Sequence, residues 1–207
     1  MLAAGAWSPR LAAAVGLELP IGFMRLQIFQ TLPMPRRLEC LLYGPRSVKQ
    51  YAIFQQLPSF RAEDFTDEAE VAAGLSILES VCQKTDGSYL LGCAMDYPGF
   101  RWEPDVAGIA LVSGMLGRQF PELAAAGFHR AWAGLLPYTS DNLPIIDHVP
   151  GIDGLIVASG HVFGNAAGPA SGALVADLVS GGVSEIDPEP YRIGRETLRE
   201  SAPGSIW

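Results

Sequence analysis

The sequence predicts an α+β fold, in which helices flank an antiparallel or mixed sheet. Apolar runs of strand length follow one another across short turn sequences, as hairpins require, and the chain lacks the strand–helix alternation that builds a parallel sheet. The 207 residues are 49% hydrophobic and 17% charged, a balance that supports a buried core and excludes disorder for most of the chain.

The first expected elements are a short helix and a strand. Ser8 is a good N-cap and Pro9 suits the first helical turn, so we expect the helix to run to about residue 15 and to stop at Gly16. Residues 21–30 alternate between apolar and polar side chains and predict a strand.

The next part of the chain has weaker patterns. Residues 31–48 contain several prolines and arginines and predict a loop, whereas residues 49–55 predict a further strand. Residues 67–73 begin with acidic side chains and continue with alanines, so a short helix is expected there.

A β-hairpin is the clearest local prediction. Apolar runs at residues 76–83 and 89–94 flank a Thr-Asp-Gly-Ser sequence, in which Asp86 and Gly87 can supply the positive φ angles of a tight turn. The two runs should therefore pair as antiparallel neighbours.

Helices and strands follow in mixed order in the second half of the chain. Pro104 and the spacing of the apolar residues after it predict a helix over residues 104–116 with one buried face. Residues 128–135 and 155–159 predict strands, the second of them buried, and the small residues 166–179 predict a helix.

Charge and cysteine content narrow the possible functions. A net charge of −8 without a stripe of Lys or Arg argues against nucleic-acid binding, and no apolar run reaches the roughly 18 residues of a membrane helix. Cys40, Cys82 and Cys93 form no C-x-x-C pair, which favours a reducing, cytoplasmic compartment and argues against disulfides or a zinc site. The scattered histidines argue against metal binding.

Glycines are concentrated in residues 159–172, between a predicted buried strand and a predicted helix. Gly168, Gly172 and Ala176 would share one helix face that permits close backbone approach. The exposed N–H groups at the start of such a helix suit an anionic or electron-rich oxygen. Tight helix-on-sheet packing without a ligand stays open as the alternative, and His161 could equally be a structural residue.

A polar turn is the second concentrated feature. A predicted strand is followed by Thr139, Ser140, Asp141 and Asn142, whose side chains can fix a turn. The turn is either a stiff polar loop or a binding loop beside the glycine-rich segment. A serine hydrolase is disfavoured, because Ser159 lacks the flanking glycines of the nucleophile elbow.

Together these segments resemble the carboxyl-terminal half of FAD-dependent oxidoreductases of the D-amino-acid-oxidase superfamily, in particular glycine oxidase and the beta subunit of sarcosine oxidase. The match spans nearly the whole chain, with residues 31–75 as its weakest part. The matching stretches, in the family's order, are residues 2–8 (LAAGAWS), residues 19–20 (LP) with 25–27 (RLQ), residues 86–92 (DGSYLLG), residues 132–146 (WAGLLPYTSDNLPII) and residues 159–164 (SGHVFG).

The resemblance implies a substrate-binding domain joined to part of an FAD-binding domain. Residues 1–18 would end one segment of the FAD-binding domain, and residues 19–130 would form the substrate-binding domain. Residues 131–185 would return to the FAD-binding domain, and residues 186–207 would form a C-terminal tail. The G-x-G-x-x-G half of the family does not occur in this sequence. We therefore expect a fragment, a truncated gene, or a partner chain that completes the protein.

The resemblance also implies which residues border FAD. The stretch at residues 2–8 would lie near the adenosine end, and residues 160–166 would border the isoalloxazine ring, with helix N–H groups stabilising negative charge at its N1/C2=O side. Leu136 and Phe163 would also face the substrate, and no catalytic residue is implied. The implied FAD-binding residues are Ala4, Gly5, Trp7, Gly134, Leu136, Pro137, Gly160, His161, Val162, Phe163, Gly164, Asn165 and Ala166.

The activity implied by the resemblance is oxidation of the CH–NH bond of a small amino or imino acid, such as sarcosine, glycine or a proline-like compound. A partner subunit of a hetero-oligomeric dehydrogenase is a further implication. Glycine-oxidase-like members carry Arg where Leu136 stands, and that Arg holds the substrate carboxylate, so this departure favours the beta-subunit type. The alternative is a non-catalytic remnant or structural subunit that keeps the fold without the flavin.

Overall fold

The computed structural model describes residues 1–199, and for residues 52 and 53 it describes the backbone alone. Residues 200–207, the end of the expected C-terminal tail, lie outside the described residues. The chain divides into two compact units. Among the described residues, unit 1 comprises residues 1–23 and 136–199, and unit 2 comprises residues 24–135.

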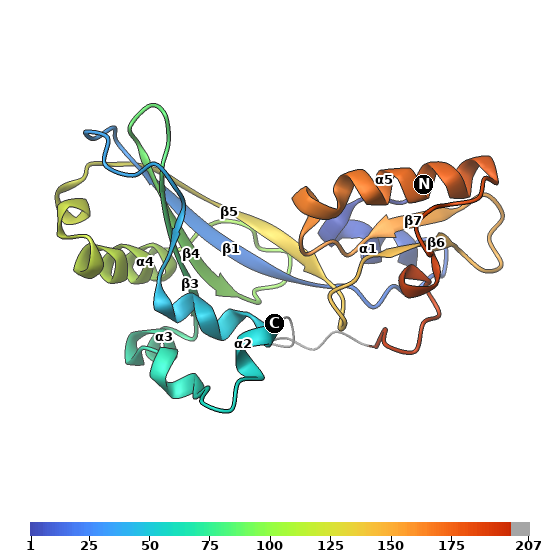
Figure 1. Ribbon diagram of the computed structural model, residues 1–207, viewed down its shortest axis with the longest axis horizontal. Coiled ribbons are helices and arrows are strands. Elements are labelled where there is room, and N and C mark those ends of the chain that lie inside the picture. Colours follow the sequence, from blue (N-terminus) through green and yellow to red (C-terminus); the bar gives the residue numbers. More distant parts are fainter. Residues whose placement is uncertain (200–207) are drawn as a thin grey trace. The chain divides into compact units, whose positions relative to one another are not determined.

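Unit 2 is built on a five-stranded sheet with the strand order β2-β3-β4-β1-β5 (Figure 1). The β2–β3, β3–β4 and β1–β4 pairs are antiparallel. Antiparallel strands with helices packed on them confirm the predicted α+β fold class. The strands are β1 (Gly22–Thr31), β2 (Leu42–Tyr43), β3 (Ser76–Gln83), β4 (Tyr89–Asp96) and β5 (Phe128–Tyr138).

The predicted hairpin is confirmed as β3 and β4. Gly87 has a φ of +87° in the connecting turn, where any other residue would be strained. Asp86 does not share this left-handed conformation. Its carboxylate instead accepts the N–H of Ser88 at 2.9 Å, so the aspartate fixes the turn through its side chain.

Helix α4 (Val106–Gln119) covers one face of this sheet. The predicted start at Pro104 is early, because Asp105 is the N-cap and its carboxylate accepts the N–H of Gly108 at 2.8 Å. The apolar face of the helix packs on the strands as predicted. The buried residues of this core are Phe29, Ile77, Val81, Tyr89, Leu91, Ala94, Val112, Met115, Leu116 and Leu123.

Short helices fill the segment between β2 and β3. The helix predicted at residues 67–73 is confirmed, with Asp67 and Glu70 forming a capping box at its start. The short helices of unit 2 are η2 (Pro45–Gln50), α2 (Ala52–Gln55), η3 (Ala62–Phe65), α3 (Glu68–Ala73) and, after α4, η4 (Pro121–Ala125).

The strand predicted at residues 49–55 is wrong, because residues 49 and 50 end η2 and residues 52–55 form α2. Val48, Tyr51 and Phe54 recur every three residues, which suits helical turns, and Pro45 starts the first of these turns. The loop predicted at residues 31–48 is correct only in part, since it contains β2 and the start of η2.

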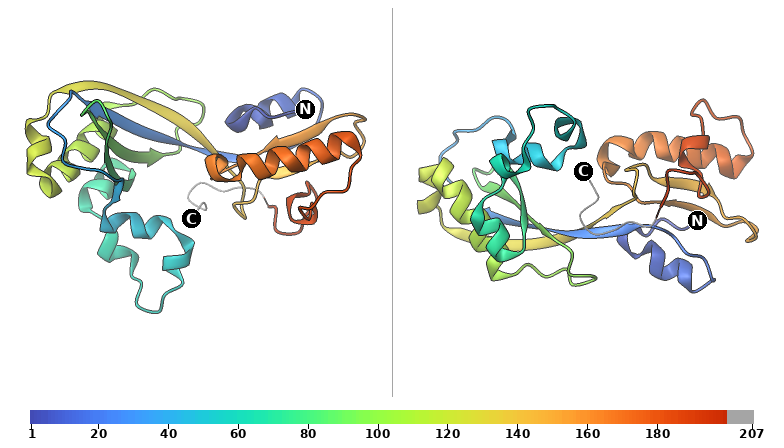
Figure 2. Two further views of the ribbon diagram at one scale, coloured as in Figure 1. Left: turned by 45° about the horizontal axis from the view of Figure 1, so that its top comes forward. Right: turned by 90° about the horizontal axis from the view of Figure 1, so that it is seen from below.

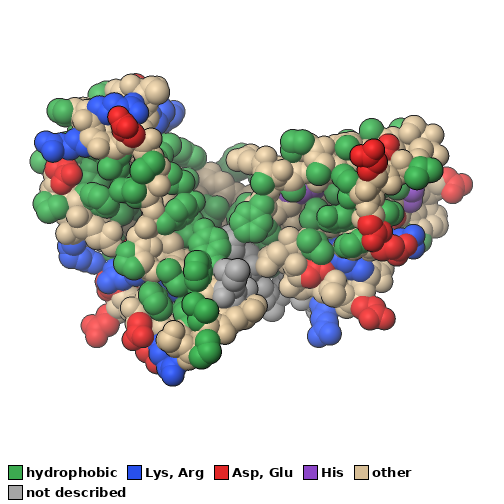
Figure 3. Space-filling model, viewed as in Figure 1, with side chains coloured by type: hydrophobic (Ala, Val, Ile, Leu, Met, Phe, Trp, Pro, Cys, Tyr) green, Lys and Arg blue, Asp and Glu red, His purple; other side chains and the backbone are tan. Residues whose placement is uncertain are grey.

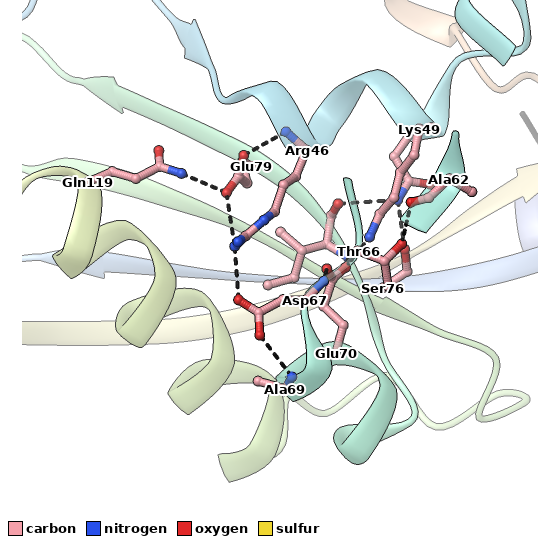
Figure 4. Close-up of polar contacts among 12 residues, drawn as sticks. Arg46, Lys49, Ala62, Thr66, Asp67, Ala69, Glu70, Ser76, Glu79 and Gln119 are labelled. Carbon is pink, nitrogen blue, oxygen red and sulfur yellow. Dashed lines mark hydrogen bonds and ion pairs between the residues drawn. The ribbon is translucent and has the colours of Figure 1, made fainter. Parts of the chain in front are cut away.

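A buried polar network holds these helices on the sheet of unit 2 (Figure 4). Glu79 on β3 is fully buried, and its carboxylate accepts the N–H of Arg46 at 2.9 Å and the side-chain amide of Gln119 at 2.7 Å. Glu70 on α3 accepts the Lys49 ammonium group at 2.5 Å. Buried carboxylates require such partners, so the network fixes η2, α3 and α4 on β3.

Unit 1 has a central antiparallel pair of strands, β6 and β7, and Leu2 forms a parallel bridge to Val157 on β7. One helix lies on each face of this pair (Figure 2). On one face Ala12 packs with Ile145 and Val157, and on the other face α5 packs near Ile146. The elements of unit 1 are η1 (Gly5–Trp7), α1 (Ser8–Ala13), β6 (Ile145–His148), β7 (Ile156–Ser159), α5 (Gly164–Ser180) and η5 (Glu189–Tyr191).

Most predictions for unit 1 and for the long strands agree with the structure. The strands predicted at residues 21–30, 128–135 and 155–159 are confirmed as β1, β5 and β7, and the helix at residues 166–179 as α5. Strand β6 was not predicted from the sequence. No helix within residues 1–199 combines the length and hydropathy that crossing a membrane requires.

The predicted N-cap of the first helix is wrong. Trp7 occupies the cap position of α1, and Ser8 is the first helical residue. The Ser8 hydroxyl instead accepts the N–H of Ala4 at 3.1 Å and lies 2.7 Å from the Ser159 hydroxyl oxygen. The Ser8 hydroxyl thus bonds to Ala4 and Ser159 instead of forming the helix-capping hydrogen bond that the sequence predicts.

Candidate functional site

The glycine-rich segment forms the junction between β7 and α5, as predicted. Gly160 turns the chain there with a φ of +84°. A Cβ atom on Gly160 would lie 2.9 Å from the Thr139 side-chain methyl carbon, closer than packed atoms tolerate. The junction therefore needs glycine for two independent reasons, its left-handed backbone and its contact with the polar turn.

Helix α5 begins at this junction without a side-chain cap. Phe163 is the N-cap residue, and its carbonyl oxygen accepts the N–H groups of Ala166 and Ala167, each at 3.0 Å. Gly164 and Asn165 precede them on the exposed end of the helix. This end carries the positive pole of the helix dipole and offers N–H donors to an electronegative atom.

A shallow cavity of about 400 Å³ lies at this helix end, within unit 1. It brings together a large part of the residues predicted to bind a cofactor, including Leu136 from the end of β5. None of its lining side chains carries a formal charge at neutral pH, so backbone dipoles dominate its electrostatics. The lining residues are Leu136, His161, Val162, Phe163, Gly164, Asn165 and Ala166.

The predicted residues near the amino terminus lie at the end of β7. The Ser159 hydroxyl donates to the carbonyl oxygen of Gly5 at 3.2 Å and contacts the Ser8 hydroxyl. Ala4 is tied to Ser8, and Trp7 follows in η1 with about two fifths of its surface exposed. The buried contact between Ser8 and Ser159 could not be predicted from sequence patterns, because its members are separated by 151 residues.

The remaining predicted positions lie on β5. Pro137 is half-buried near the end of the strand and does not line the shallow cavity. Gly134 belongs to unit 2, and a Cβ atom added there would meet nothing within 4 Å. Contacts among the described residues therefore do not require glycine at position 134.

The predicted close backbone approach along α5 does not occur within the described residues. Added Cβ atoms at Gly168 and Gly172 would meet nothing within 4 Å, and both glycines are exposed together with Ala176. The three residues do share a face, but helix α5 buries Leu174 on its other side. The small residues leave this face open instead of packing it on the sheet.

The polar turn after β5 is fixed by its side chains, as predicted. The Thr139 hydroxyl donates to the carbonyl oxygen of Leu143 at 2.7 Å. The Asp141 carboxylate accepts two hydrogen bonds from Arg195, at 2.7 and 2.8 Å. Asn142 adopts a left-handed conformation with a φ of +61°. Arg195 was not predicted as part of this turn, because it lies in the polar C-terminal segment.

His161 lies at the junction with its imidazole half-buried. Its Nε2 atom lies 2.9 Å from the hydroxyl oxygen of Ser171 on α5. Burial lowers the pKa of the His161 imidazole below its ordinary value, which favours the neutral ring. A neutral histidine held by a serine can accept or donate one hydrogen bond in the junction without adding charge.

Comparison with known proteins gives consistent matches. A family model described as FAD dependent oxidoreductase matches residues 1–178. Glycine oxidase of Pseudomonas aeruginosa is 32% identical over 192 residues, which cover 92% of this chain and 44% of that protein. Hydrogen cyanide synthase subunit HcnC of Pseudomonas protegens is 30% identical over 195 residues, covering 91% of this chain and 38% of that protein.

The fold agrees with a solved structure as well. The crystal structure of glycine oxidase from Geobacillus kaustophilus superimposes with a TM-score of 0.72 and 23% sequence identity, over 93% of this chain and 44% of that one. At this identity the superposition shows the shared fold. The chain spans less than half the length of the relatives that it matches.

Proposed function

The chain belongs to the family of FAD-dependent oxidoreductases, and we propose that within the complete protein it forms one wall of a flavin site that oxidises the CH–NH bond of a small amino or imino acid. The observation that carries this proposal is the shallow cavity at the start of α5. Its lining coincides with the residues that the family resemblance assigns to the flavin.

The donor set of this cavity fits a flavin. The uncapped start of α5 offers backbone N–H groups at Gly164 and Asn165, which suit the carbonyl oxygen and ring nitrogen of an isoalloxazine. When bound, FAD would accept the hydride that leaves the carbon bearing the amine. The positive end of the helix stabilises negative charge held beside it.

The chain's other residues shape the site. Leu136 and Val162 supply an apolar wall, which would exclude water from this side of a bound flavin and so strengthen the interaction of the flavin with the helix end. Neutral His161 adds a polar group without a charge. Gly160 leaves room for the Thr139 methyl group beside the junction.

We propose the same domain division as the sequence suggests. Residues 1–18 and 131–185 would belong to the FAD-binding domain, residues 19–130 to the substrate-binding domain and residues 186–207 to a tail. The compact units, which divide at residues 23/24 and 135/136, support a division of this kind. Ala4, Gly5 and Trp7 would then lie toward the adenosine end of FAD, and Gly134 and Pro137 toward the ring.

The substrate would be glycine, sarcosine or a proline-like imino acid, as the names of the relatives suggest. A partner polypeptide or a further half of the protein would complete the site. Hydrophobic side chains gather on the surface of unit 2 in the view of Figure 3 and support such a contact. Leu32, Tyr43 and Phe128 of this unit are each about half exposed. Three free cysteines support a cytoplasmic location.

The proposal is tested by flavin content. The intact protein should show a flavin absorption band, and Gly164→Val should abolish it, because a branched side chain would fill the helix end. Ala173→Val is the control, since it places the same side chain on an exposed part of α5. Unchanged flavin content in Gly164→Val would show that the junction is packing alone. A protein that stays colourless with added FAD would instead support the non-catalytic remnant.

A further inference from the structure

Two serine hydroxyls meet directly behind the junction between β7 and α5, within unit 1. The Oγ atoms of Ser8 and Ser159 lie 2.7 Å apart, and both residues are almost completely buried. Ser159 is the last residue of β7, so its side chain is attached one residue before Gly160, where the chain turns into the junction. The contact therefore connects the junction to the amino-terminal segment of the chain.

The direction of each hydrogen bond follows from the number of protons that two hydroxyls carry. The Ser159 hydroxyl donates its proton to the carbonyl oxygen of Gly5 at 3.2 Å, so Ser8 must donate the proton that lies between the two serines. The Ser8 oxygen in turn accepts the N–H of Ala4 at 3.1 Å. A chain of three hydrogen bonds thus runs from the backbone of Ala4 through both hydroxyls to the backbone of Gly5, and it uses both hydroxyl protons.

These hydrogen bonds extend the attachment of the amino-terminal segment to β7. The N–H of Leu2 donates to the carbonyl oxygen of Ile156 at 2.7 Å, and its carbonyl oxygen accepts the N–H of Ala158 at 2.9 Å. Beyond Leu2 the segment leaves strand geometry, since Gly5 has a φ of +55° and opens η1. Backbone groups that leave a strand need other partners, and the two serines supply them.

The two segments that the serines join are those assigned to opposite ends of FAD. Under the proposed function, residues 4–7 lie toward the adenosine end and residues 160–166 border the ring. A ligand that contacts two segments at once binds more tightly than its separate halves only when the spacing of the segments matches its length. A buried pair of hydrogen-bonded side chains can fix such a spacing, because breaking it would leave polar groups without partners.

We propose that Ser8 and Ser159 are positioning residues for FAD, which hold residues 4–7 and the start of α5 at the separation that lets one FAD molecule contact both. Because both serines are buried, they act through the backbone that they hold and not by contact with the cofactor. The inference rests on the proposed function, and its test separates failure of the hydroxyl pair from failure of the flavin site.

The test compares FAD with its two halves, FMN and AMP, in the flavin-free form of the intact protein. We expect Ser159→Ala and Ser8→Ala each to weaken FAD binding about tenfold, the effect of one lost hydrogen bond, and to change the dissociation constants of FMN and AMP by less than about twofold. The double variant should lose no more than either single variant, because the pair acts as a unit. Ser180→Ala, which removes an exposed hydroxyl at the far end of α5, is the control.

A second measurement needs no flavin. In the 207-residue chain, Ser8→Ala should shift the amide NMR signals of residues 160–166, although Ser8 and Ser159 are 151 residues apart in sequence. Unchanged signals there, unchanged FAD affinity in both variants, or an equal loss of affinity for FAD and for its halves would overturn the proposal. If the halves bind too weakly to be measured, additive losses in the double variant would overturn it. An unaltered protein that binds no FAD would instead contradict the proposed function, and the positioning role would fall with it.

Discussion

Arg195 holds Asp141 by a bidentate ion pair that joins the C-terminal segment to the polar turn of unit 1. Its Nε atom lies 2.7 Å from Oδ2 and its Nη2 atom 2.8 Å from Oδ1, with the two side chains only 6% and 13% exposed. Arg195 also donates to the carbonyl oxygen of Leu143 at 2.7 Å. The pair thus fixes the turn that carries Asn142.

Breaking this pair should destabilise unit 1. Arg195→Met leaves the Asp141 carboxylate buried without its partner, and we expect the free energy of unfolding to fall by about 3 kcal/mol in urea unfolding followed by circular dichroism. Arg192→Met is the matched control, since its ion pair with Glu189 is more than half exposed and should contribute less than about 1 kcal/mol. Equal effects of the two substitutions would contradict the structural role of Arg195.

The same carboxylate should contribute to acid sensitivity. Burial alone would raise the pKa of Asp141, but the hydrogen bonds from Arg195, Thr197 and the Leu143 N–H outweigh it and lower the pKa. The unfolded chain, with an ordinary aspartate pKa of about 3.9, therefore binds protons more readily than the folded one. The stabilisation is present above about pH 4 and is lost as the pH falls toward the folded pKa.

Asp141→Asn should remove this part of the pH dependence. The difference in unfolding free energy between the unaltered protein and the variant is expected to be large at pH 6 and to shrink steadily below pH 4. Glu185→Gln, which removes an exposed carboxylate, serves as the control. A difference that stays constant from pH 6 to pH 2 would show that ionisation of Asp141 does not support the fold.

Two glycines of one motif should respond in opposite directions to alanine. Gly160→Ala should destabilise the protein by about 2 kcal/mol, because its φ is +84° and its Cβ atom would lie 2.9 Å from the Thr139 methyl carbon. Gly172→Ala, at an exposed position in the middle of α5, should stabilise it by about 0.5 to 1 kcal/mol by restricting the unfolded chain. Thermal unfolding of both variants measures the contrast, and destabilisation by Gly172→Ala would reveal a contact along that helix face.

The sequence predicts features that depend on neighbouring residues and misses those that depend on distant ones. The residues Asp86 and Gly87 determine the geometry of their turn locally, so the hairpin could be predicted. The partner of Asp141 could not, because Arg195 follows 54 residues later and a guanidinium in a polar tail has no local signature. Ser8 is a similar case, since its preference for a helix cap gives way to the buried contact with Ser159.

The candidate site divides in the same way. The order of strand, glycine and helix around His161 can be predicted from consecutive residues, and residues 161–166 of this segment line the shallow cavity. Whether repeated glycines pack closely is a tertiary property, and Gly168 shows that the spacing alone does not decide it. The strand prediction for residues 49–55 is wrong because the segment has too few apolar residues for their spacing to distinguish a strand from helical turns.

Arg25 should be the most sensitive charged residue of unit 2. It is fully buried, and its guanidinium donates to Asp96 from Nε at 2.8 Å and to Asp105 from Nη2 at 2.6 Å. Asp105 also caps α4, so Arg25 couples β1 and β4 to that helix. Arg25→Met would leave two carboxylates close together with only the exposed Arg101 near one of them, and we expect a loss of about 3 kcal/mol or more in urea unfolding.

Loss of the ion pairs of Arg25 can be distinguished from loss of its packed volume. Arg101→Met is the control, because Arg101 is 63% exposed and lies 3.9 Å from Asp105, so its removal should change stability by less than about 1 kcal/mol. Adding Asp96→Asn to Arg25→Met should recover part of the loss, since one of the two stranded charges disappears. If the double variant is as unstable as Arg25→Met alone, the arginine acts through its packed volume, and the ion pairs of this cluster contribute little to the stability of unit 2.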